Sequence, residues 1–384
     1  MPSAYVPRAI DLKALVKTKS GFLFGARQTG KSWLVKKTLP EARVYDLLDD
    51  AVFVELNRNP HLIEQEWNAK RREIIVVDEI QRIPGLLNEV HRLIELHGIR
   101  FLLTGSSARK LGRAGVNTLG GRARVHHLHP FVSAELGTRF DVALAVNRGL
   151  LPSIYLSDSP DADLAAYAGA YLRQEVAAEA LTRNIPAFSR FLQVAASCNG
   201  TLINYSRISN DAQVPRTTVM EYFSILYETL IGHEVTAWQR SAKRKPLSTS
   251  KLYFFDPGVA RHLQGRGEIR KGTTEFGSAV ETLVFHELRS YCDYRGVDGL
   301  SYWRSTSGFE VDFVVADMVA VEVKATGRIA PADLKGLRAL REEALLRDYY
   351  CVVLDESTRD MDGIHVVPLR VFLQRLWSGE IVRS

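Results

Sequence analysis

The sequence predicts an α/β protein whose N-terminal part is built on a parallel sheet and whose C-terminal part forms further folded modules. Apolar runs at residues 22–24, 74–77 and 101–103 predict strands, of which the run at 74–77 suits a parallel strand buried on both faces. The chain of 384 residues is also too long for a single hydrophobic core, which favours two or three domains.

Composition narrows the class of protein. A hydrophobic fraction of 46% and a charged fraction of 24% are typical of soluble globular chains. No apolar run approaches the roughly 18–20 residues that span a bilayer, and the first residues lack a signal-peptide pattern. The three cysteines match no metal or disulfide spacing, so we expect a cytoplasmic protein without membrane association. A net charge of +6 permits a nucleic-acid partner without requiring one.

A glycine-containing segment follows the first predicted strand and opens a helix. It reads Gly25, Ala26, Arg27, Gln28, Thr29, Gly30, Lys31 and Ser32, with Trp33 next in the chain. A strand, a glycine-rich loop and a helix form the context of a Walker A phosphate-binding loop, in which backbone N–H groups surround a triphosphate. We predict that Lys31 binds the outer phosphates and that Ser32 is a Mg²⁺ ligand. The alternative is an ordinary turn before a helix.

Two adjacent carboxylates, Asp78 and Glu79, end the strand predicted at residues 74–77. The carboxyl ends of parallel strands are where ligands bind in open α/β sheets. We therefore predict that Asp78 holds the nucleotide Mg²⁺ through water and that Glu79 polarises the water that attacks the γ-phosphate. The alternative is a solvated turn.

Two further residues are candidates for contacts with the γ-phosphate. Ser106 follows the strand predicted at residues 101–104, where a small polar residue can sense the phosphate, although serine is equally suited to cap a helix. Arg122 precedes a strand-like stretch at residues 125–128 and can act as an arginine finger, in cis or from a neighbouring subunit. Its alternative is a surface arginine.

These motifs carry a family resemblance that extends over nearly the whole chain. The residues concerned are Phe24–Ser32, Val77–Gln81, Leu103–Ser107, Gly121-Arg122, Leu128–Phe131, Gly149–Pro152 and Glu310–Phe313. Together they resemble AAA-type P-loop ATPases. More narrowly, the chain is similar to a large prokaryotic family in which such an ATPase is fused to a C-terminal domain of unknown function. The resemblance implies an ATP- and Mg²⁺-dependent ATPase core at residues 1–140. The Ala- and Leu-rich residues 141–185, with a helical pattern over 163–180, are interpreted as a helical lid.

A winged helix is predicted at residues 186–264. Two helices joined by a tight turn, the second starting after Pro215, have helix-turn-helix spacing. The N-terminal residues of that second helix are where recognition helices contact DNA, namely Arg216, Thr217 and Thr218. Strands at residues 231–238 and 251–255 would flank a basic wing that contains Lys243, Arg244 and Lys245, which suits a phosphate backbone. The alternative is a winged helix that contacts protein.

The last 120 residues, 265–384, predict a restriction-endonuclease-like α/β domain. Asp312, Glu322 and Lys324 match the PD-(D/E)xK nuclease pattern across a hairpin of two strands, residues 309–315 and 318–324. Carboxylates from adjacent strands can chelate Mg²⁺ while a lysine activates water. A preceding helix at residues 275–288 brings Glu281 as a further metal ligand, and a helix at residues 331–346 and a strand at 350–354 follow. The alternative is a hairpin with a solvated polar face, in which Glu322 and Lys324 are charge partners.

The sequence therefore predicts an ATP hydrolase that couples its nucleotide state to DNA binding or processing by the C-terminal half. The rival interpretation is an ATP-gated interaction module whose nuclease-like domain is an inactive docking surface. Formation of an oligomer stays open, because it depends on the role of Arg122.

Overall fold

The computed structural model describes residues 5–67, 73–107, 119–171, 184–327 and 329–382, and it divides into two compact units. The N-terminal unit consists of Pro7–Pro130 together with the short segment Glu228–Ile231. The C-terminal unit consists mainly of Phe131–Tyr227 and Gly232–Ser384. The four-domain division predicted from the sequence stays a prediction.

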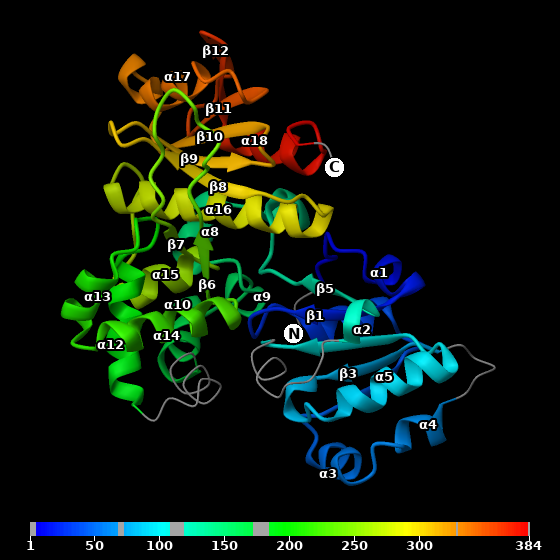
Figure 1. Cartoon of the computed structure of the whole chain (residues 1–384). Helices are drawn as coiled ribbons and strands as arrows, with labels where there is room; N and C mark the ends of the chain where they lie inside the picture. Colours follow the sequence, from blue (N-terminus) through cyan, green and yellow to red (C-terminus); the bar gives the residue numbers. More distant parts are fainter. Residues whose placement is uncertain (1–4, 68–72, 108–118, 172–183, 328, 383–384) are drawn as a thin grey trace. The chain divides into compact units, whose positions relative to one another are not determined.

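The N-terminal unit is an α/β fold around a five-stranded sheet, shown in blue and cyan in Figure 1. Its strands are β1 (Ser20–Phe24), β2 (Arg43–Asp46), β3 (Ile75–Asp78), β4 (Phe101–Gly105) and β5 (Ala123–His127), in the order β2-β3-β4-β1-β5. The helices are α1 (Leu12–Thr18), α2 (Lys31–Thr38), α3 (Asp50–Arg58), α4 (Leu62–Glu66) and α5 (Leu86–His97). All strand pairs are parallel, which confirms the predicted sheet.

Burial of the sheet explains why the apolar runs form strands. Every residue of β1, β3 and β4 is buried, and their side chains pack with α5 in one hydrophobic core. Because β4 lies between β1 and β3, the carboxyl ends of these three strands meet at one edge of the sheet. The candidate nucleotide residues lie at that edge.

The C-terminal unit begins with short helices that follow the predicted lid only in part. They are α7 (Ser133–Leu136), α8 (Val142–Arg148), α9 (Pro152–Tyr155) and α10 (Pro160–Ala166). The helix predicted at 163–180 corresponds to the end of α10 and to the π-helical turn Tyr167–Tyr171, and its residues from 172 onward lie outside the described residues. Gly149, with a positive φ of 79°, closes the turn after α8. The backbone amide of the next residue, Leu150, donates a hydrogen bond to the buried Asp256 carboxylate (2.6 Å). That carboxylate also caps α15 (Pro257–Leu263), so it joins two segments.

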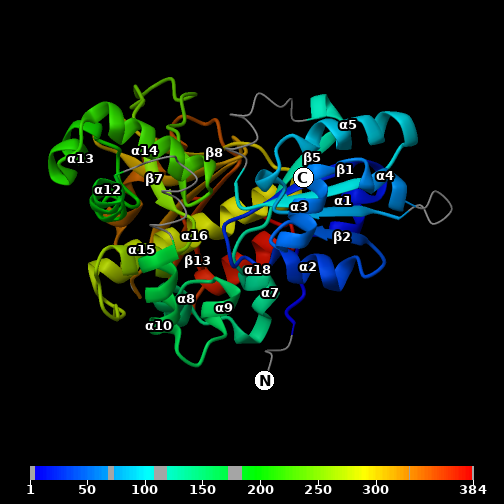
Figure 2. The same ribbon diagram turned by 90° about the horizontal axis from the view of Figure 1, so that it is seen from below.

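Three helices and a two-stranded sheet occupy residues 185–254. They are α12 (Ile185–Ser197), α13 (Tyr205–Ala212), α14 (Arg216–Glu228), β6 (Gly232–Val235) and β7 (Lys251–Phe254). The helices lie side by side in Figures 1 and 2, drawn in green. They pack around edge-on and tilted aromatic rings, among them Phe188, Phe191, Tyr222 and Phe223.

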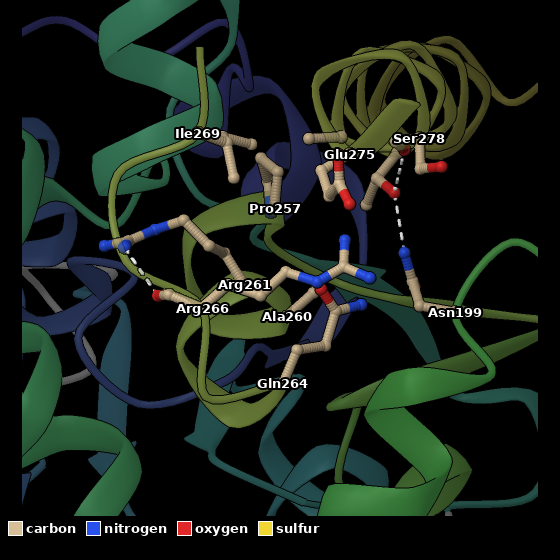
Figure 3. Close-up of a pocket in the computed structure, with 11 residues that line it drawn as sticks. Asn199, Pro257, Ala260, Arg261, Gln264, Arg266, Ile269, Glu275 and Ser278 are labelled. Carbon is tan, nitrogen blue, oxygen red and sulfur yellow. Dashed lines mark hydrogen bonds between the residues drawn. The ribbon is translucent and has the colours of Figure 1, made fainter. Parts of the chain in front are cut away.

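A polar joint links this helical segment to the rest of the C-terminal unit. Asn199 donates to the Thr282 hydroxyl (2.7 Å) and accepts from the Phe254 amide (2.7 Å). Figure 3 shows Asn199, Arg261 of α15 and Gln264, which follows α15, around the small pocket at this joint. The segment is therefore tied to the helix that carries Thr282.

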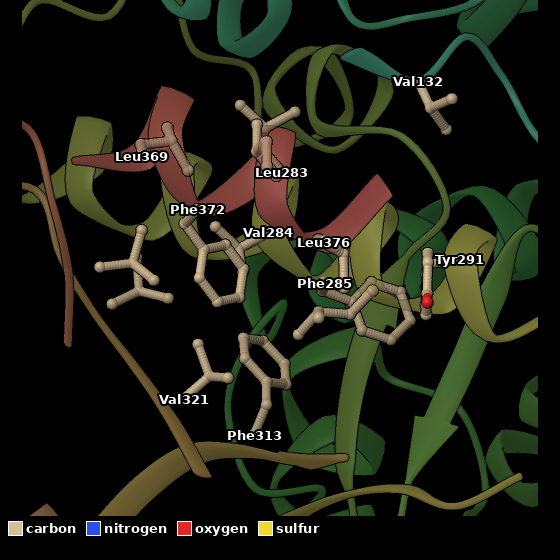
Figure 4. Packing of buried hydrophobic residues seen from close by; sticks show 14 of the residues in the cluster. Val132, Leu283, Val284, Phe285, Tyr291, Phe313, Val321, Leu369, Phe372 and Leu376 are labelled. Atoms are coloured by element: carbon tan, nitrogen blue, oxygen red, sulfur yellow. The ribbon is translucent and has the colours of Figure 1, made fainter. Parts of the chain in front are cut away.

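A six-stranded mixed sheet forms the last part of the chain. Its strands are β8 (Leu300–Arg304), β9 (Glu310–Val315), β10 (Val319–Lys324), β11 (Asp348–Val353), β12 (Arg359–Met361) and β13 (Ile364–Pro368), in the order β12-β13-β11-β10-β9-β8. The helices are α16 (Thr274–Arg295), α17 (Lys335–Arg341) and α18 (Leu369–Trp377). Apolar side chains of α16 and α18, such as Val284 and Phe372, pack on β9 and β10 residues such as Phe313 (Figure 4). On the other face, α17 packs in a second cluster.

Two predicted helix boundaries here are wrong. The helix predicted at 275–288 continues to Arg295, because the first residue to end it is Gly296 in a left-handed conformation (φ 65°). The helix predicted at 331–346 begins as a 3₁₀ turn, Pro331–Leu334, and α17 ends at Arg341.

Candidate functional site

Glycine geometry shapes the loop between β1 and α2. Gly30 has a left-handed conformation (φ 94°, ψ 23°) at the N-cap of α2, which a side chain would strain. At Gly25, a Cβ atom would come within 2.4 Å of the Leu128 carbonyl oxygen. Thr29 donates to the Ala26 carbonyl (2.8 Å) and closes the turn. The loop is therefore a tight backbone curve at the carboxyl end of β1, in which Gln28 also has a positive φ of 63°.

The lysine and the serine of this loop point to different neighbours. The Lys31 ammonium group donates to the carbonyl oxygens of Gly25 (2.8 Å) and Ala26 (3.3 Å), within the loop itself. The Ser32 hydroxyl donates to Oδ2 of Asp78 (2.8 Å), and Thr104 donates to the other oxygen of the same carboxylate. The structure thus brings together the predicted Mg²⁺ ligands Ser32 and Asp78.

Glu79 is connected to Ser106 through Gln81. The Gln81 side-chain amide donates to Oε2 of Glu79 and to the Ser106 hydroxyl (3.1 Å). Glu79 itself has a left-handed backbone (φ 58°, ψ 45°), which is uncommon for a residue with a side chain and is often found at functional sites. Residues 108–118 lie outside the described residues, so the alternative that Ser106 caps a helix stays open.

Arg8 braces the loop from the start of the unit. Its guanidinium donates to the carbonyl oxygens of Thr29 (2.6 Å), His129 (2.6 Å) and Pro130 (3.2 Å). It therefore connects the phosphate loop to the segment that follows β5. By contrast, the Trp33 side chain is 54% exposed on α2 and lies near the Lys37 ammonium group (5.9 Å from the ring centre).

Arg122 does not lie beside the phosphate loop of its own unit. It precedes Ala123, which pairs with Ser20 at the start of β1, whereas the loop follows the other end of that strand. The guanidinium forms an ion pair with Glu95 near the end of α5. The expectation of a finger in cis is therefore corrected by the register of β5, and only action in trans stays a prediction.

The residues at this edge fit a magnesium nucleotide. The loop offers a backbone curve that side chains at Gly25 and Gly30 would obstruct, and Lys31 supplies a positive charge beside it. The Ser32 hydroxyl and the Asp78 carboxylate are the hard oxygen ligands that Mg²⁺ prefers.

The predicted DNA-contacting residues have different environments. Arg216 and Thr217 are exposed at the start of α14, and Thr218 is half-buried. The predicted wing residues Lys243 and Arg244 instead contact the acidic end of α17. Arg244 pairs with Glu342 (2.5 Å), and the amides of Ala242, Lys243 and Arg244 all donate to the Glu343 carboxylate (2.8–3.1 Å).

These contacts correct the expectation of a free basic wing. The Lys243 ammonium group donates to the Glu342 carbonyl oxygen, and Arg244 stacks over the Phe309 ring (5.3 Å). Much of the positive charge of the loop is therefore balanced within the chain. Lys245 is exposed.

The hairpin β9–β10 places the predicted nuclease residues together. Its antiparallel register, in which Phe313 pairs with Val321, puts Asp312 and Glu322 at neighbouring positions on the two strands. The Lys324 ammonium group donates to Glu322 (2.6 Å), and the Val323 amide donates to Asp312 (2.8 Å). Glu281 of α16 accepts from the Tyr253 hydroxyl (2.5 Å).

Burial and neighbouring carboxylates shift the titration of this cluster. Desolvation, with the charge of Asp312, raises the pKa of Glu281 to about 7. Desolvation also raises the pKa of Asp312, and it raises that of Glu322 well above its ordinary value. Burial alone lowers the pKa of Lys251, but the charges of Glu281, Asp312 and Glu310 outweigh it and raise that pKa.

An open groove of about 720 Å³ lies beside this cluster. Residues from the start of α16 and from the end of β10 line it, including Glu281 and Lys324. Solvent can therefore reach one side of the cluster.

A metal-like arrangement also occurs in the N-terminal unit. Among the described residues, one set of three or more ligand-type side chains has ligand atoms within 4.8 Å of one another, namely His61, Glu64 and Glu89. Arg92 donates to both carboxylates of this set, so an internal cation already balances them. Glu281, Asp312 and Glu322 do not meet that spacing.

The sequence interpretation missed five residues of these sites. Gln81, Thr104 and Arg8 in the N-terminal unit, and Lys251 and Tyr253 on β7, contact the predicted residues directly. Gln81 and Thr104 are polar residues within or beside apolar runs, which is a usable signal. Nothing local marks Arg8, Lys251 or Tyr253, whose partners are distant in sequence.

The comparisons agree with this geometry. Residues 17–137 match a family model described as an AAA domain, and residues 139–270 and 276–372 match two models described as domains of unknown function. The chain therefore contains an AAA-type P-loop ATPase domain, followed by segments similar to domains of unknown function.

Two similar relatives are described as uncharacterized proteins. A protein of Mycobacterium tuberculosis is 24% identical over 312 residues, which cover 79% of this chain and 69% of that protein. A protein of Haemophilus influenzae is 23% identical over 246 residues, 59% of this chain and 60% of that protein. Among solved structures, a Walker-type ATPase of Pyrococcus abyssi is similar at 16% identity with a TM-score of 0.45, over 66% of this chain and 93% of its own.

The ORC1 protein of Aeropyrum pernix, solved in complex with DNA, is similar at 15% identity with a TM-score of 0.24, over 68% of this chain and 94% of its own.

Within the described part of the chain, we find no helix with the length and apolar character needed to cross a membrane.

Proposed function

We propose that this protein binds MgATP at the loop between β1 and α2 and hydrolyses it. The observation that carries the proposal is the convergence of Ser32, Asp78 and Glu79 at one edge of the sheet, next to the Lys31 ammonium group. Bound Mg²⁺ would be held by Ser32 and Asp78 and would neutralise charge on the phosphate oxygens.

Different residues of the site bind the phosphates and activate the attacking water. The amides of the loop and Lys31 bind and orient the phosphates. Glu79 orients a water molecule and takes its proton, while Gln81 fixes the Glu79 carboxylate relative to Ser106. Thr104 and Ser32 hold Asp78 in place.

Two substitutions test this division. Lys31→Ala should abolish ATP binding, and Glu79→Gln should preserve binding but stop hydrolysis. Nucleotide binding is measured by calorimetry and turnover by phosphate release. Hydrolysis by Glu79→Gln at the wild-type rate would show that Glu79 does not activate the water.

We further propose that nucleotide state regulates DNA binding by the C-terminal unit, with α14 as the contacting helix. Support comes from the exposed Arg216 and Thr217 at the N-terminus of α14 and from the net charge of +6. A winged helix is the fold that we propose for residues 186–264, and a restriction-endonuclease-like fold is proposed for residues 265–384.

A rival proposal is that the C-terminal unit docks a protein partner instead. The contacts of Lys243 and Arg244 favour this proposal, because both residues already bind Glu342 or Glu343 of the same chain. These contacts leave less of the basic loop available to a phosphate backbone. DNA processing at Asp312, Glu322 and Lys324 stays a prediction, and the charges around these residues argue against it, as described below.

Salt dependence separates DNA binding from docking. Arg216→Ala should weaken DNA affinity and lower the salt slope by about 0.9 for each lost phosphate contact with duplex DNA. The matched control is Arg207→Ala on α13, where the arginine lies near Asp211 (3.6 Å). Wild-type protein that shows no DNA binding, or binding without salt dependence, favours the docking proposal.

A further inference from the structure

Four carboxylates meet three basic side chains in the C-terminal unit. The carboxylates belong to Glu281 on α16, Glu310 and Asp312 on β9, and Glu322 on β10. The basic groups belong to Lys251 on β7, Lys324 on β10 and Arg304 on β8. Lys251 is the member that comes from the helical segment before the sheet.

Lys251 is buried within this cluster, with 3% of its surface exposed. Its ammonium group lies 2.6 Å from Oε1 of Glu310 and 3.7 Å from Oε1 of Glu281, and it lies over the Tyr302 ring (5.3 Å). A buried ammonium group loses its hydration and is stable only beside counter-charges. Glu281 and Glu310 are therefore the counter-ions that allow Lys251 to be buried.

Each of the four carboxylates already accepts hydrogen bonds or forms an ion pair within the protein. Glu310 contacts Lys251 and Arg304 (3.3 Å), and Glu281 accepts from Tyr253. Asp312 accepts from the Val323 amide. Glu322 accepts from Lys324 and from the Asp312 amide (3.3 Å).

Charge balance then opposes a divalent ion. Four carboxylates face three cationic side chains, so the ionised cluster has one surplus negative charge. A dication added beside Lys251 would reverse the sign of this balance and would compete with the Lys251 ammonium group for Glu281 and Glu310. The donor set therefore does not fit Mg²⁺ while Lys251 is in place.

We propose that the ammonium group of Lys251 is the resident cation of this cluster. It pairs with Glu281 and Glu310 without a divalent metal and joins β7 to α16 and β9 through charge. The C-terminal unit then takes a divalent ion only when Lys251 is removed. This proposal is independent of the proposed ATPase activity.

The experiment uses the full chain, stripped with EDTA and without nucleotide. MnCl₂ is the probe, in calorimetric titrations and in thermal unfolding. Wild-type protein should show no Mn²⁺ binding that is sensitive to Asp312→Asn, and this comparison separates the cluster from any binding at Asp78. Mn²⁺ binding that Asp312→Asn abolishes would overturn the proposal.

A lysine variant supplies the second arm. Lys251→Met should lower the melting temperature in EDTA, and millimolar Mn²⁺ should restore much of the loss. The matched control is Lys324→Met, because Lys324 is more exposed (31% of its side chain) and contacts one carboxylate of the cluster. It should lower the melting temperature less and respond less to Mn²⁺.

An unchanged melting temperature in Lys251→Met would also overturn the proposal. If this variant does not fold, Lys251→Arg, which keeps the charge, should fold and should still bind no Mn²⁺ at the cluster. The wild-type titration decides the question of the metal in every case.

Discussion

The Gln81 side chain connects Glu79 to Ser106 at the candidate catalytic edge of the sheet. Because its amide donates to both Glu79 and Ser106, we expect Gln81→Leu to leave Glu79 misoriented. The predicted effect is a decrease in kcat on the order of tenfold to a hundredfold, with KM for ATP little changed, since small misplacements of a catalytic group cost that much. Steady-state ATPase kinetics measure both constants.

Ser106→Ala is the matched control for this prediction. It removes the hydroxyl group but leaves the contact between Gln81 and Glu79 in place. A larger loss of kcat in Ser106→Ala than in Gln81→Leu would indicate that Ser106 contacts the phosphate directly and that Gln81 is incidental.

Glu287 predicts a pH dependence of stability. It is fully buried and accepts from the Trp377 indole (2.6 Å) and the Ser133 amide (2.7 Å), but desolvation raises its pKa to about 7. A folded pKa above the unfolded value means that the folded state binds the extra proton. The stabilisation is therefore complete below the unfolded pKa and is lost as pH rises through about 7.

The measurement compares wild type with Glu287→Gln by denaturant unfolding near pH 5 and near pH 8. Relative to the variant, wild type should lose about 3 kcal/mol of unfolding free energy over this range, at about 1.36 kcal/mol per pKa unit. Nearby Glu135 raises the same pKa and is a smaller contributor. Parallel pH profiles for the two proteins would mean that the donors keep Glu287 ionised throughout.

At the scale of elements, replacing two helical glycines by alanine should change the stability of the protein in opposite directions. A Cβ atom at Gly336 of α17 would lie 1.9 Å from the Glu310 carbonyl oxygen, whereas the nearest atom at Gly277 of α16 is Ala325 Cβ at 3.8 Å. Gly336→Ala should therefore destabilise the protein by about 1–3 kcal/mol through overpacking against β9. Gly277→Ala should stabilise it by up to about 1 kcal/mol through helix propensity.

Thermal and denaturant unfolding of both variants test this pair. A neutral Gly336→Ala variant would show that α17 can move away from the sheet at little cost.

The elements that the sequence predicts well are those with a dense local signal. The all-apolar strand before Asp78 and the loop from Gly25 to Ser32 are specified by neighbouring residues, so strand, turn and helix follow from the local pattern. The β9–β10 hairpin was predictable for the same reason.

The contacts that could not be predicted depend on residues far apart in the chain. The sequence predicts a free basic wing at Lys243 and Arg244 because their partners Glu342 and Glu343 lie about a hundred positions away. Lys251 is a single charged residue in an apolar strand, and only the folded sheet brings Glu281 and Glu310 to it. Local periodicity contains no information on such pairs.

At the scale of the whole molecule, we expect the two compact units to unfold in separate thermal transitions. MgATP should raise the melting temperature of the N-terminal unit, since a ligand at a hundred times its Kd adds about 2.7 kcal/mol. Scanning calorimetry with Glu79→Gln avoids turnover, and Lys31→Ala should show no shift. If nucleotide state is coupled to the C-terminal unit, its transition shifts as well. A C-terminal transition that is indifferent to MgATP would contradict the coupling.

The position of Arg8 has a consequence for how such a signal travels. The chain enters the N-terminal unit at Pro7 and leaves it at Pro130, and Arg8 contacts the carbonyl oxygens of both Pro130 and the phosphate-loop residue Thr29. A displacement of the loop therefore alters hydrogen bonds beside two of the places where the backbone passes between the units, before Pro7 and after Pro130. One guanidinium group can therefore transmit a change at the phosphate loop to the backbone at residues 6–7 and 130–131, where the chain passes from one unit to the other.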